Sequence, residues 1–76
     1  MGLVEELKAA RLPNPAQRRA IRVRAGATLA DIGDALGVSA VSVSRWELGD
    51  AEPRRELAIR YAVLLDGLRD VPKAAP

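Results

Sequence analysis

The sequence of 76 residues contains no cysteine and no histidine. Without cysteine the chain can form neither a disulfide nor a thiolate metal site, and without histidine it lacks the commonest general base of enzymes. It also has no glycine-rich phosphate loop, and so short a chain encloses no deep pocket. We therefore expect no enzymatic activity, no metal, no cofactor and no small-molecule ligand.

Long apolar runs are missing as well. No stretch is long enough to span a bilayer, and the first residues do not follow the pattern of a signal peptide. The lack of cysteine fits a reducing compartment. We therefore expect a cytoplasmic protein that makes no membrane contact.

A large excess of one charge is also absent, because 12 basic residues face 10 acidic ones, for a net charge of +2. All but two of the basic residues are arginine, which binds phosphate through a planar fork and reads guanine with two hydrogen bonds. A GC-rich genome would enrich arginine in the same way. The near balance of charge excludes a polycation, so any nucleic-acid site must be confined to one face.

Alanine, leucine and arginine dominate what is present, and no strand-like alternation is visible, so we expect an all-helical chain. The first apolar residues are Leu3, Val4 and Leu7. They indicate a short amphipathic helix that ends before Pro13. Asn14, followed by Pro15 and by Gln17 three residues after the cap, is typical of a helix start. This second helix is expected to end near Gly26.

Two short helices with a tight turn between them are expected next. Thr28 caps the first, with Asp31 placed to complete a capping box, and the helix stops at Gly37. Ser39 caps the second helix, which ends at Gly49. The turn between them needs a residue that accepts a positive φ, and Gly37 supplies it.

Pro53 is expected to open a last helix that reaches about Leu68. These patterns divide the chain into a short helix and linker at residues 1–14 and a helical domain at residues 15–68. A flexible tail is expected at residues 69–76.

The spacing of small and apolar residues in this region suits two closely crossed helices. Gly33 lies four residues before Gly37 and lets the helices approach, and Val43, six residues after Gly37, points into the core. With these positions the stretch resembles the Cro/C1-type helix-turn-helix family, also called the XRE family. The residues that carry the resemblance are Leu29, Ile32, Gly33, residues 36–39, residues 43–47, Gly49, Pro53, Ala62 and Leu65.

The resemblance implies an all-α, lambda-repressor-like five-helix bundle that binds double-stranded DNA. Its recognition helix, Ser39 to Leu48, would enter the major groove of an operator. The chain departs from the family at three positions: Gly33 replaces the usual alanine, Leu29 a frequent glutamine that holds phosphate, and Asp50 a frequent basic residue. The last two departures weaken the expected phosphate contacts.

The expected DNA contacts are Thr28, Ser39, Ala40, Val41, Ser42, Ser44, Arg45 and Arg54. Arg45 is the candidate for reading guanine, with a solvated surface charge as the alternative. Ala40 and Val41 match family positions that contact bases, where small apolar groups touch thymine methyls. The serines can bond phosphate or base edges, although Ser39 can also serve only as a cap. Helix starts at Thr28 and Ser39 attract phosphate, and Arg54 matches a phosphate contact of the family.

Two structural contacts follow from the same resemblance. The family has a carboxylate at the position of Glu47 that bonds an arginine on the first bundle helix, and Arg22 occupies the matching position. We therefore expect a bidentate Arg22–Glu47 ion pair. Val43 and Trp46 should face inward.

The last helix is apolar almost all round, which exceeds what one edge of a small bundle requires. By family position Ala58, Ala62 and Leu65 fill the core, with Tyr61 at its border. The residues left without a partner are Ile59, Val63, Leu64 and Leu68. Either the apolar residues of the first helix fold back over them, or a second copy packs on them about a two-fold axis. We expect a homodimer, which would match a palindromic site.

Several functions within this class stay open. An antitoxin of the same fold, a helical protein-interaction adaptor and an excisionase-like accessory factor all fit the pattern. No ligand-sensing domain follows the helix-turn-helix in this sequence, so we favour a phage-type, Cro-like repressor.

Overall fold

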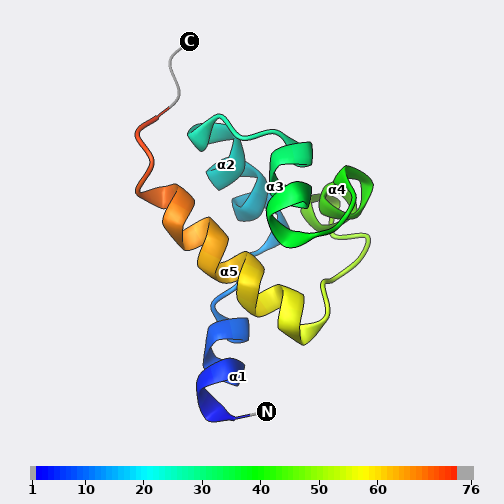
Figure 1. The fold of residues 1–76 in the computed structure, drawn as a ribbon, viewed down its shortest axis with the longest axis vertical. Helices are drawn as coiled ribbons and strands as arrows, with labels where there is room; N and C mark the ends of the chain where they lie inside the picture. Colours follow the sequence, from blue (N-terminus) through cyan, green and yellow to red (C-terminus); the bar gives the residue numbers. More distant parts are fainter. Residues whose placement is uncertain (1, 74–76) are drawn as a thin grey trace.

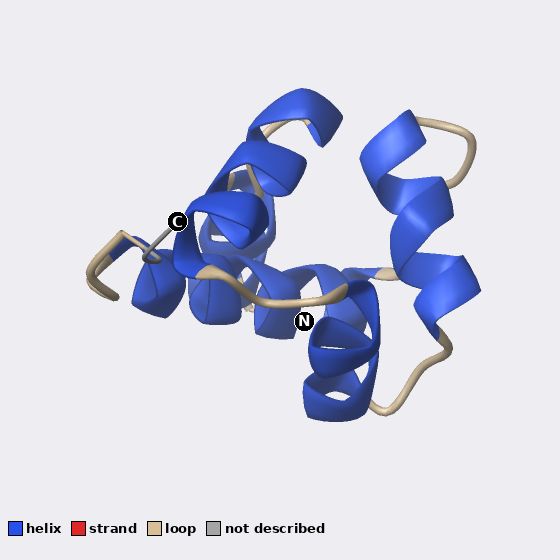
Figure 2. Cartoon of the chain, turned by 90° about the horizontal axis from the view of Figure 1, so that it is seen from above, coloured by secondary structure: helices blue, strands red, loops and turns tan. Residues whose placement is uncertain are grey.

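The computed structural model describes residues 2–73, and over that range it contains five helices and no strand (Figures 1 and 2). The helices are α1 (Leu3–Ala10), α2 (Pro15–Ala25), α3 (Leu29–Leu36), α4 (Ala40–Leu48) and α5 (Arg55–Arg69). The all-α class expected from the sequence is confirmed. Part of the expected tail, residues 74–76, lies outside the described residues.

The helices begin and end close to the predicted capping residues. Asn14 and Gln17 form a reciprocal capping box at the start of α2, and Thr28 and Asp31 form one at the start of α3. Gly37 ends α3 in the left-handed region, with a φ of 74°, which a side chain would disfavour. These local hydrogen bonds explain why the sequence predicted the boundaries of α2, α3 and α4 well.

The predicted start of the last helix was wrong by two residues, because α5 begins at Arg55 rather than Pro53. Arg54 is extended, with a ψ of 159°, and caps α5 without a side-chain hydrogen bond. The fixed φ of proline suits an extended segment as well as a first helical turn, and local sequence does not choose between them. Here Glu52 is bound to Arg18 of α2, which holds the segment against the bundle before α5 begins.

The core lies between α5 on one side and α2, α3 and α4 on the other (Figure 1). Its buried residues are Ile32, Leu36, Val43, Trp46, Tyr61 and Leu65. Val43 and Trp46 face inward as expected, and the Trp46 and Tyr61 rings pack with centroids 5.3 Å apart. Tyr61 was expected at the border of the core, but it is fully buried.

The apolar residues of α5 have more partners than the sequence suggested. Leu64 and Leu68 are half-buried and pack against the core, so they are not free surface residues. Ile59 is also half-buried, whereas Val63 is 58% exposed. The sequence did not predict this burial of Leu64 and Leu68. Both α2 and α3 pack against α5, so the apolar face that α5 buries is wider than contact with one helix would require.

An ion pair ties α2 to α4. Arg22 Nε donates to Glu47 Oε2 at 2.6 Å and its Nη2 donates to Glu47 Oε1 at 2.9 Å, which is the bidentate geometry expected. The third arm of the guanidinium, Nη1, donates to the carbonyl of Ala27 at 3.0 Å. Both side chains are largely shielded, with 13% and 4% of their surfaces exposed. The hydrogen bond to Glu47 raises the pKa of Arg22, although burial opposes this shift.

We predict that Glu47→Ala lowers the stability of the domain strongly. Removing one partner of a shielded pair leaves the other charge uncompensated and costs about 3–5 kcal/mol. The matched control is Glu6→Ala, because the Glu6–Arg55 pair is exposed on both sides, with 54% and 49% of the two side chains accessible; a surface pair is worth about 1 kcal/mol or less. Thermal unfolding measures both variants, and equal melting temperatures for the two would contradict the structural role of Glu47.

The buried hydroxyl of Tyr61 makes stability depend on alkaline pH. Burial, followed by the negative charge of Glu47, raises the pKa of Tyr61 to about 12. Between the ordinary value of 10.0 and that value, the unfolded chain releases the phenolic proton and the folded chain keeps it. Stability therefore falls as pH rises through this window.

We predict that Tyr61→Phe removes this loss of stability. The hydroxyl has no hydrogen-bond partner among the described residues, so its deletion should leave the melting temperature at neutral pH equal or higher. Melting temperatures of both proteins between pH 9 and pH 11.5 test the prediction, since Tyr61 is the only tyrosine of the chain. Parallel decline of the two proteins with pH would rule it out.

Candidate nucleic-acid interface

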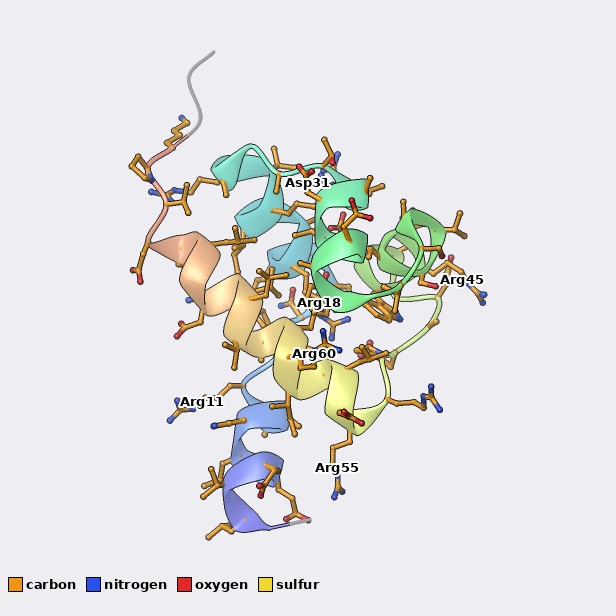
Figure 3. All side chains as sticks on the ribbon, viewed as in Figure 1. Arg11, Arg18, Asp31, Arg45, Arg55 and Arg60 are labelled. Carbon is orange, nitrogen blue, oxygen red and sulfur yellow. The ribbon has the colours of Figure 1, made fainter. Side chains whose placement is uncertain are left out.

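The outward face of α4 carries the side chains that the sequence assigned to base contacts. Because Val43 and Trp46 point into the core, the opposite face holds Val41, which is 69% exposed, and Arg45. Figure 3 shows Arg45 extending from α4 away from the body of the protein. The expected contacts Ala40, Ser42 and Ser44 are half-buried beside them. Ala40 and Ser42 lie about 200° apart around the helix and therefore border the exposed face on opposite sides.

Leu48 is a further member of this face that sequence reasoning missed. It lies seven residues after Val41, which places it two turns along the same side of the helix, and it is 69% exposed. The i, i+7 spacing of two apolar residues could have revealed it. The outward face of α4 therefore has an apolar residue on either side of Arg45.

The start of α4 is fixed by its close approach to α3. A side-chain carbon at Gly33 would lie 2.6 Å from the carbonyl oxygen of Val38, so only glycine fits this arrangement without movement. The Val38 N–H in turn donates to the Gly33 carbonyl at 2.9 Å. Because this contact is between backbone atoms, it sets the position of α4 rigidly against α3.

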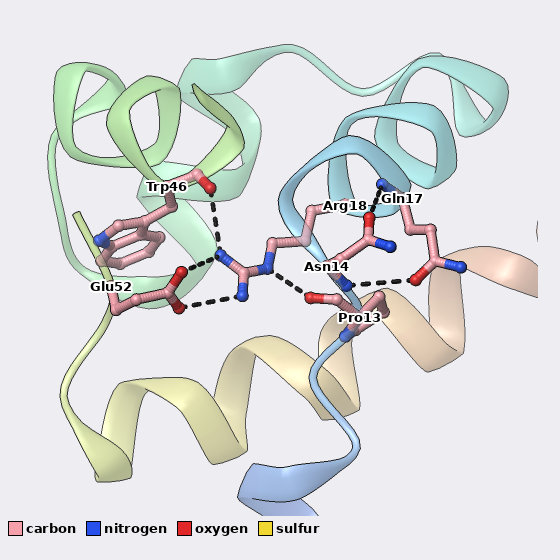
Figure 4. A network of polar contacts seen from close by, with 6 residues as sticks. All are labelled: Pro13, Asn14, Gln17, Arg18, Trp46 and Glu52. Carbon is pink, nitrogen blue, oxygen red and sulfur yellow. Dashed lines mark hydrogen bonds and ion pairs between the residues drawn. The ribbon is translucent and has the colours of Figure 1, made fainter. Parts of the chain in front are cut away.

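The end of α4 is held by Arg18, a residue to which the sequence analysis assigned no role (Figure 4). Its Nη1 donates to the Trp46 carbonyl at 3.1 Å, its Nε donates to the Pro13 carbonyl at 2.7 Å, and its outer nitrogens bind the Glu52 carboxylate. Arg18 is only 4% exposed. One guanidinium thus joins the linker before α2, the last turn of α4 and the segment before α5.

The spacing of Arg18 and Arg22 was the signal that could have identified this network. Residues four apart lie on the same face of a helix, so both arginines of α2 point toward α4. Two arginines on the inner face of a helix are costly to bury unless their N–H groups find hydrogen-bond acceptors. The pair therefore indicated buried carboxylates or carbonyls nearby. Only the fold could show that these acceptors are Glu47, Glu52 and backbone carbonyls.

The helix-turn-helix itself carries few positive charges. Between Thr28 and Asp50 the only basic residue is Arg45, whereas four residues are acidic: Asp31, Asp34, Glu47 and Asp50. Glu47 is neutralised by Arg22, but the others are exposed. Such a surface repels phosphate outside the immediate reach of Arg45.

The start of α3 differs from the expectation that it attracts phosphate. The Thr28 N–H already donates to Asp31 Oδ2 at 2.8 Å, and the Asp31 N–H donates to Thr28 Oγ1 at 3.0 Å. Bonding by the Thr28 backbone, and next by its side chain, lowers the pKa of Asp31, which favours the charged carboxylate. An anion approaching this helix start would therefore meet a carboxylate.

The start of α4 has no such obstacle. Ser39 Oγ accepts from the Ser42 N–H at 3.1 Å, and the two hydroxyls lie 3.1 Å apart. No acidic residue stands in the first turn of this helix. Of the two helix starts, the one at Ser39 is thus the better placed to accept a phosphate.

The basic residues at the start of α5 lie outside the helix-turn-helix. Arg54 is exposed and forms no ion pair among the described residues, while Arg55 lies 3.7 Å from Glu6 of α1 in an exposed pair. Arg54 therefore has a guanidinium available to a ligand. In the described part of the chain no group of residues is placed to hold a metal, and no helix is long and apolar enough to cross a membrane.

Comparison with known proteins agrees with this geometry. The profile of a family described as "Helix-turn-helix domain" matches residues 16–72, well over half of the chain. No match was found among curated proteins or among solved structures. The matched region begins inside α2 and contains α3, α4 and α5 completely. The chain belongs to the helix-turn-helix domain family.

Proposed function

We propose that this protein is a sequence-specific, double-stranded DNA-binding regulator of transcription, without enzymatic activity, that acts in the cytoplasm. The observation that carries the proposal is the outward face of α4, where Arg45 and Val41 stand free of the core on a helix clamped at both ends. In a helix-turn-helix this is the surface that enters the major groove. A Cro/C1-type repressor of phage type remains the form that we favour.

The side chains of this face have separate roles in the proposed complex. Arg45 reads a guanine through two hydrogen bonds, and Val41 and Ala40 contact thymine methyl groups. Ser42 and Ser44 bond base edges or nearby phosphates. These assignments would make the sequence preference depend on few contacts from each copy.

Phosphate contacts are assigned to two places that flank α4. The N–H groups and the hydroxyl at Ser39 donate hydrogen bonds to one phosphate. The free guanidinium of Arg54 binds another. Thr28 contributes little to phosphate binding, because Asp31 occupies the start of α3 and its carboxylate already accepts from the Thr28 N–H. The acidic residues around α4 keep this affinity low for a single copy.

Two copies would supply the missing affinity, and we therefore propose a homodimer. Val63 on α5 is 58% exposed, and Ile59 on the same helix is half-buried. Leu64 and Leu68 pack against the core but keep part of their side-chain surface exposed. A two-fold axis near this surface would place two recognition helices about one DNA turn, roughly 34 Å, apart.

An adaptor or antitoxin that binds a protein is the second candidate, and the surface of the helix-turn-helix favours it. The exposed Leu48 and the carboxylates of Asp31, Asp34 and Asp50 suit a partner with basic and apolar residues better than they suit a phosphate backbone. An excisionase-like DNA-binding factor would use the same face as a repressor. Binding to duplex DNA separates the adaptor from the other candidates.

The DNA-binding proposal is tested by comparing two arginine variants. Arg45→Ala should weaken binding to a selected specific site about 5- to 150-fold more than binding to random duplex, because a bidentate guanine contact is worth about 1–3 kcal/mol of discrimination. Arg54→Ala should weaken both almost equally and reduce the salt dependence, because phosphate contacts carry no sequence information. The site is selected from a random duplex pool, and failure of the wild-type protein to enrich any sequence would favour the adaptor.

The dimer is tested by sedimentation of the free protein over a concentration series. Val63→Glu should give a monomer that still folds, because Val63 is exposed in the single chain. Val23→Glu is the matched control, since Val23 is also a helical valine and is 51% exposed, on α2. A wild-type protein that stays monomeric at every concentration and binds one copy per site would exclude the dimer.

A further inference from the structure

The segment between α4 and α5 connects two parts of the proposed DNA-binding surface. Arg45 lies in the last turn of α4, and Arg54 is the residue directly before α5. In the proposed complex Arg45 reads a base and Arg54 binds a phosphate, so both must reach one duplex at the same time. The path of the segment therefore decides whether Arg54 meets the DNA backbone while α4 lies in the groove.

Backbone hydrogen bonds hold this segment only at its ends. Residues 51–53 take part in no backbone–backbone hydrogen bond among the described residues, and Figure 1 shows them in the extended stretch between the two helices. The Arg54 carbonyl accepts from the Ala58 N–H at 2.7 Å, which fixes the side toward α5. No side chain caps this helix start. The chain before Arg54 thus needs another support.

Glu52 supplies this support by binding a buried cation. Its carboxylate accepts from Arg18 Nη1 at 3.3 Å and from Nη2 at 3.0 Å (Figure 4). In the described part of the chain, residues 51–53 make no side-chain hydrogen bond or ion pair other than this one. The anchor is rigid, because Arg18 is 4% exposed and also donates to the carbonyls of Pro13 and Trp46.

The link from Glu52 to Arg54 is short and stiff. The ring of Pro53, which lies between them, fixes its own φ and keeps the preceding residue extended. Arg54 is extended as well, with a ψ of 159°. A carboxylate anchored on Arg18 therefore fixes where the chain enters α5 and where the Arg54 side chain leaves the backbone.

Arg18 relates the two DNA-contacting arginines to one point. It binds the carbonyl of Trp46, which directly follows Arg45. It also binds the carboxylate of Glu52, which lies two residues before Arg54. One planar group thus sets the position of the base-reading side chain relative to that of the phosphate-binding side chain.

The negative charge of Glu52 by itself opposes DNA binding. Its side chain is 61% exposed and lies close in sequence to Arg54, and a carboxylate repels phosphate. Asp50 stands exposed in the same segment and forms no ion pair among the described residues. The two carboxylates therefore differ in their contact with Arg18. Comparing them separates the effect of charge from the effect of position.

We propose that Glu52 is a positioning residue of the DNA complex: held by Arg18, it sets Arg54 on the phosphate backbone while α4 lies in the major groove. The inference rests on the proposed DNA-binding function and specifies how two of its contacts are joined. A contact that is fixed in advance costs less to order on binding than one made from a loose segment. An acidic side chain here strengthens binding to a polyanion.

The test compares Glu52→Gln with Asp50→Asn in binding to the selected site and to random duplex. Each substitution removes one negative charge and keeps the size of the side chain. Glu52→Gln also breaks the two-oxygen contact, because an amide offers the guanidinium only one acceptor. Glu52→Gln should bind both duplexes about two- to twelvefold more weakly, the cost of ordering one group. Asp50→Asn should bind both at least as tightly as the unsubstituted protein.

A double variant tests whether Glu52 acts through Arg54. Glu52→Gln combined with Arg54→Ala should bind no more weakly than Arg54→Ala alone, because the contact to be positioned is already gone. The loss of site preference caused by Arg45→Ala should be the same with and without Glu52→Gln, since the Arg22–Glu47 pair still holds α4.

Thermal unfolding sets the assay temperature at which each variant is folded. Where Glu52→Gln is unfolded at that temperature, Glu52→Asp takes its place. It keeps the charge that compensates Arg18 but shortens the side chain by one bond, which draws the segment away from its position. Glu52→Asp should also weaken binding to both duplexes, and binding equal to that of the unsubstituted protein would contradict the proposal.

Three results would overturn the inference and leave DNA binding in place. Glu52→Gln binding as tightly as Asp50→Asn would show that Glu52 acts only as a charge. Losses from Glu52→Gln and Arg54→Ala that add in full would show that Glu52 acts elsewhere. No effect of Arg54→Ala in the unsubstituted protein would remove the contact that Glu52 positions. Failure of the unsubstituted protein to bind any duplex would reject the proposed function together with the inference.

Discussion

Two guanidinium groups on one face of α2 hold α4 in place. Arg22 binds the carboxylate of Glu47 and Arg18 binds the carbonyl of Trp46, so adjacent turns of α2 fix adjacent residues of α4. Charged groups are costly to bury unless each donor finds an acceptor, and these two arginines find several. The apolar core of so small a domain supplies packing, but the directional bonds determine where α4 stands.

The clamp allows the outward face of α4 to differ from the usual composition of a DNA-binding surface. Residues 28–50 carry one basic side chain, and the cations that could neutralise phosphate lie on α2, α5 and α1. The backbone contact at Gly33 and the cap at Ser39 fix the position of α4. The charged side chains on its outward face are therefore not needed to hold the helix in place. In the proposed complex one copy would therefore contribute little electrostatic affinity, and a second copy would add affinity and selectivity.

The helices α1 and α5 supply the surface through which such pairing can occur. A single chain of this size cannot cover every apolar side chain of five helices, because the ratio of surface to volume is high. Here three of the exposed large apolar residues lie together on α1 and Val63 is exposed on α5, while the others lie on α2, on α4 and after α5. Exposed apolar residues that form a contiguous patch mark an interaction site, whereas single ones are ordinary.

The sequence by itself determined the helices and much of the site. Caps at Asn14, Thr28 and Ser39, and the glycines after α2, α3 and α4, act within a few residues and could be read directly. The resemblance to a known family supplied the Arg22–Glu47 pair and the inward side of α4. Local patterns of this kind need no knowledge of the rest of the chain.

The tertiary structure decided what depends on neighbours distant in sequence. Tyr61, Leu64 and Leu68 lose exposed surface because neighbouring helices pack against α5. Arg18 is buried because its hydrogen-bond acceptors, 28 and 34 residues away in sequence, lie beside it in the fold. The side of α1 that faces solvent was likewise fixed by docking, which used Ala9 and left the leucines free. Periodicity shows which residues share a helix face, but the direction of that face is set by packing between elements, where no local rule applies.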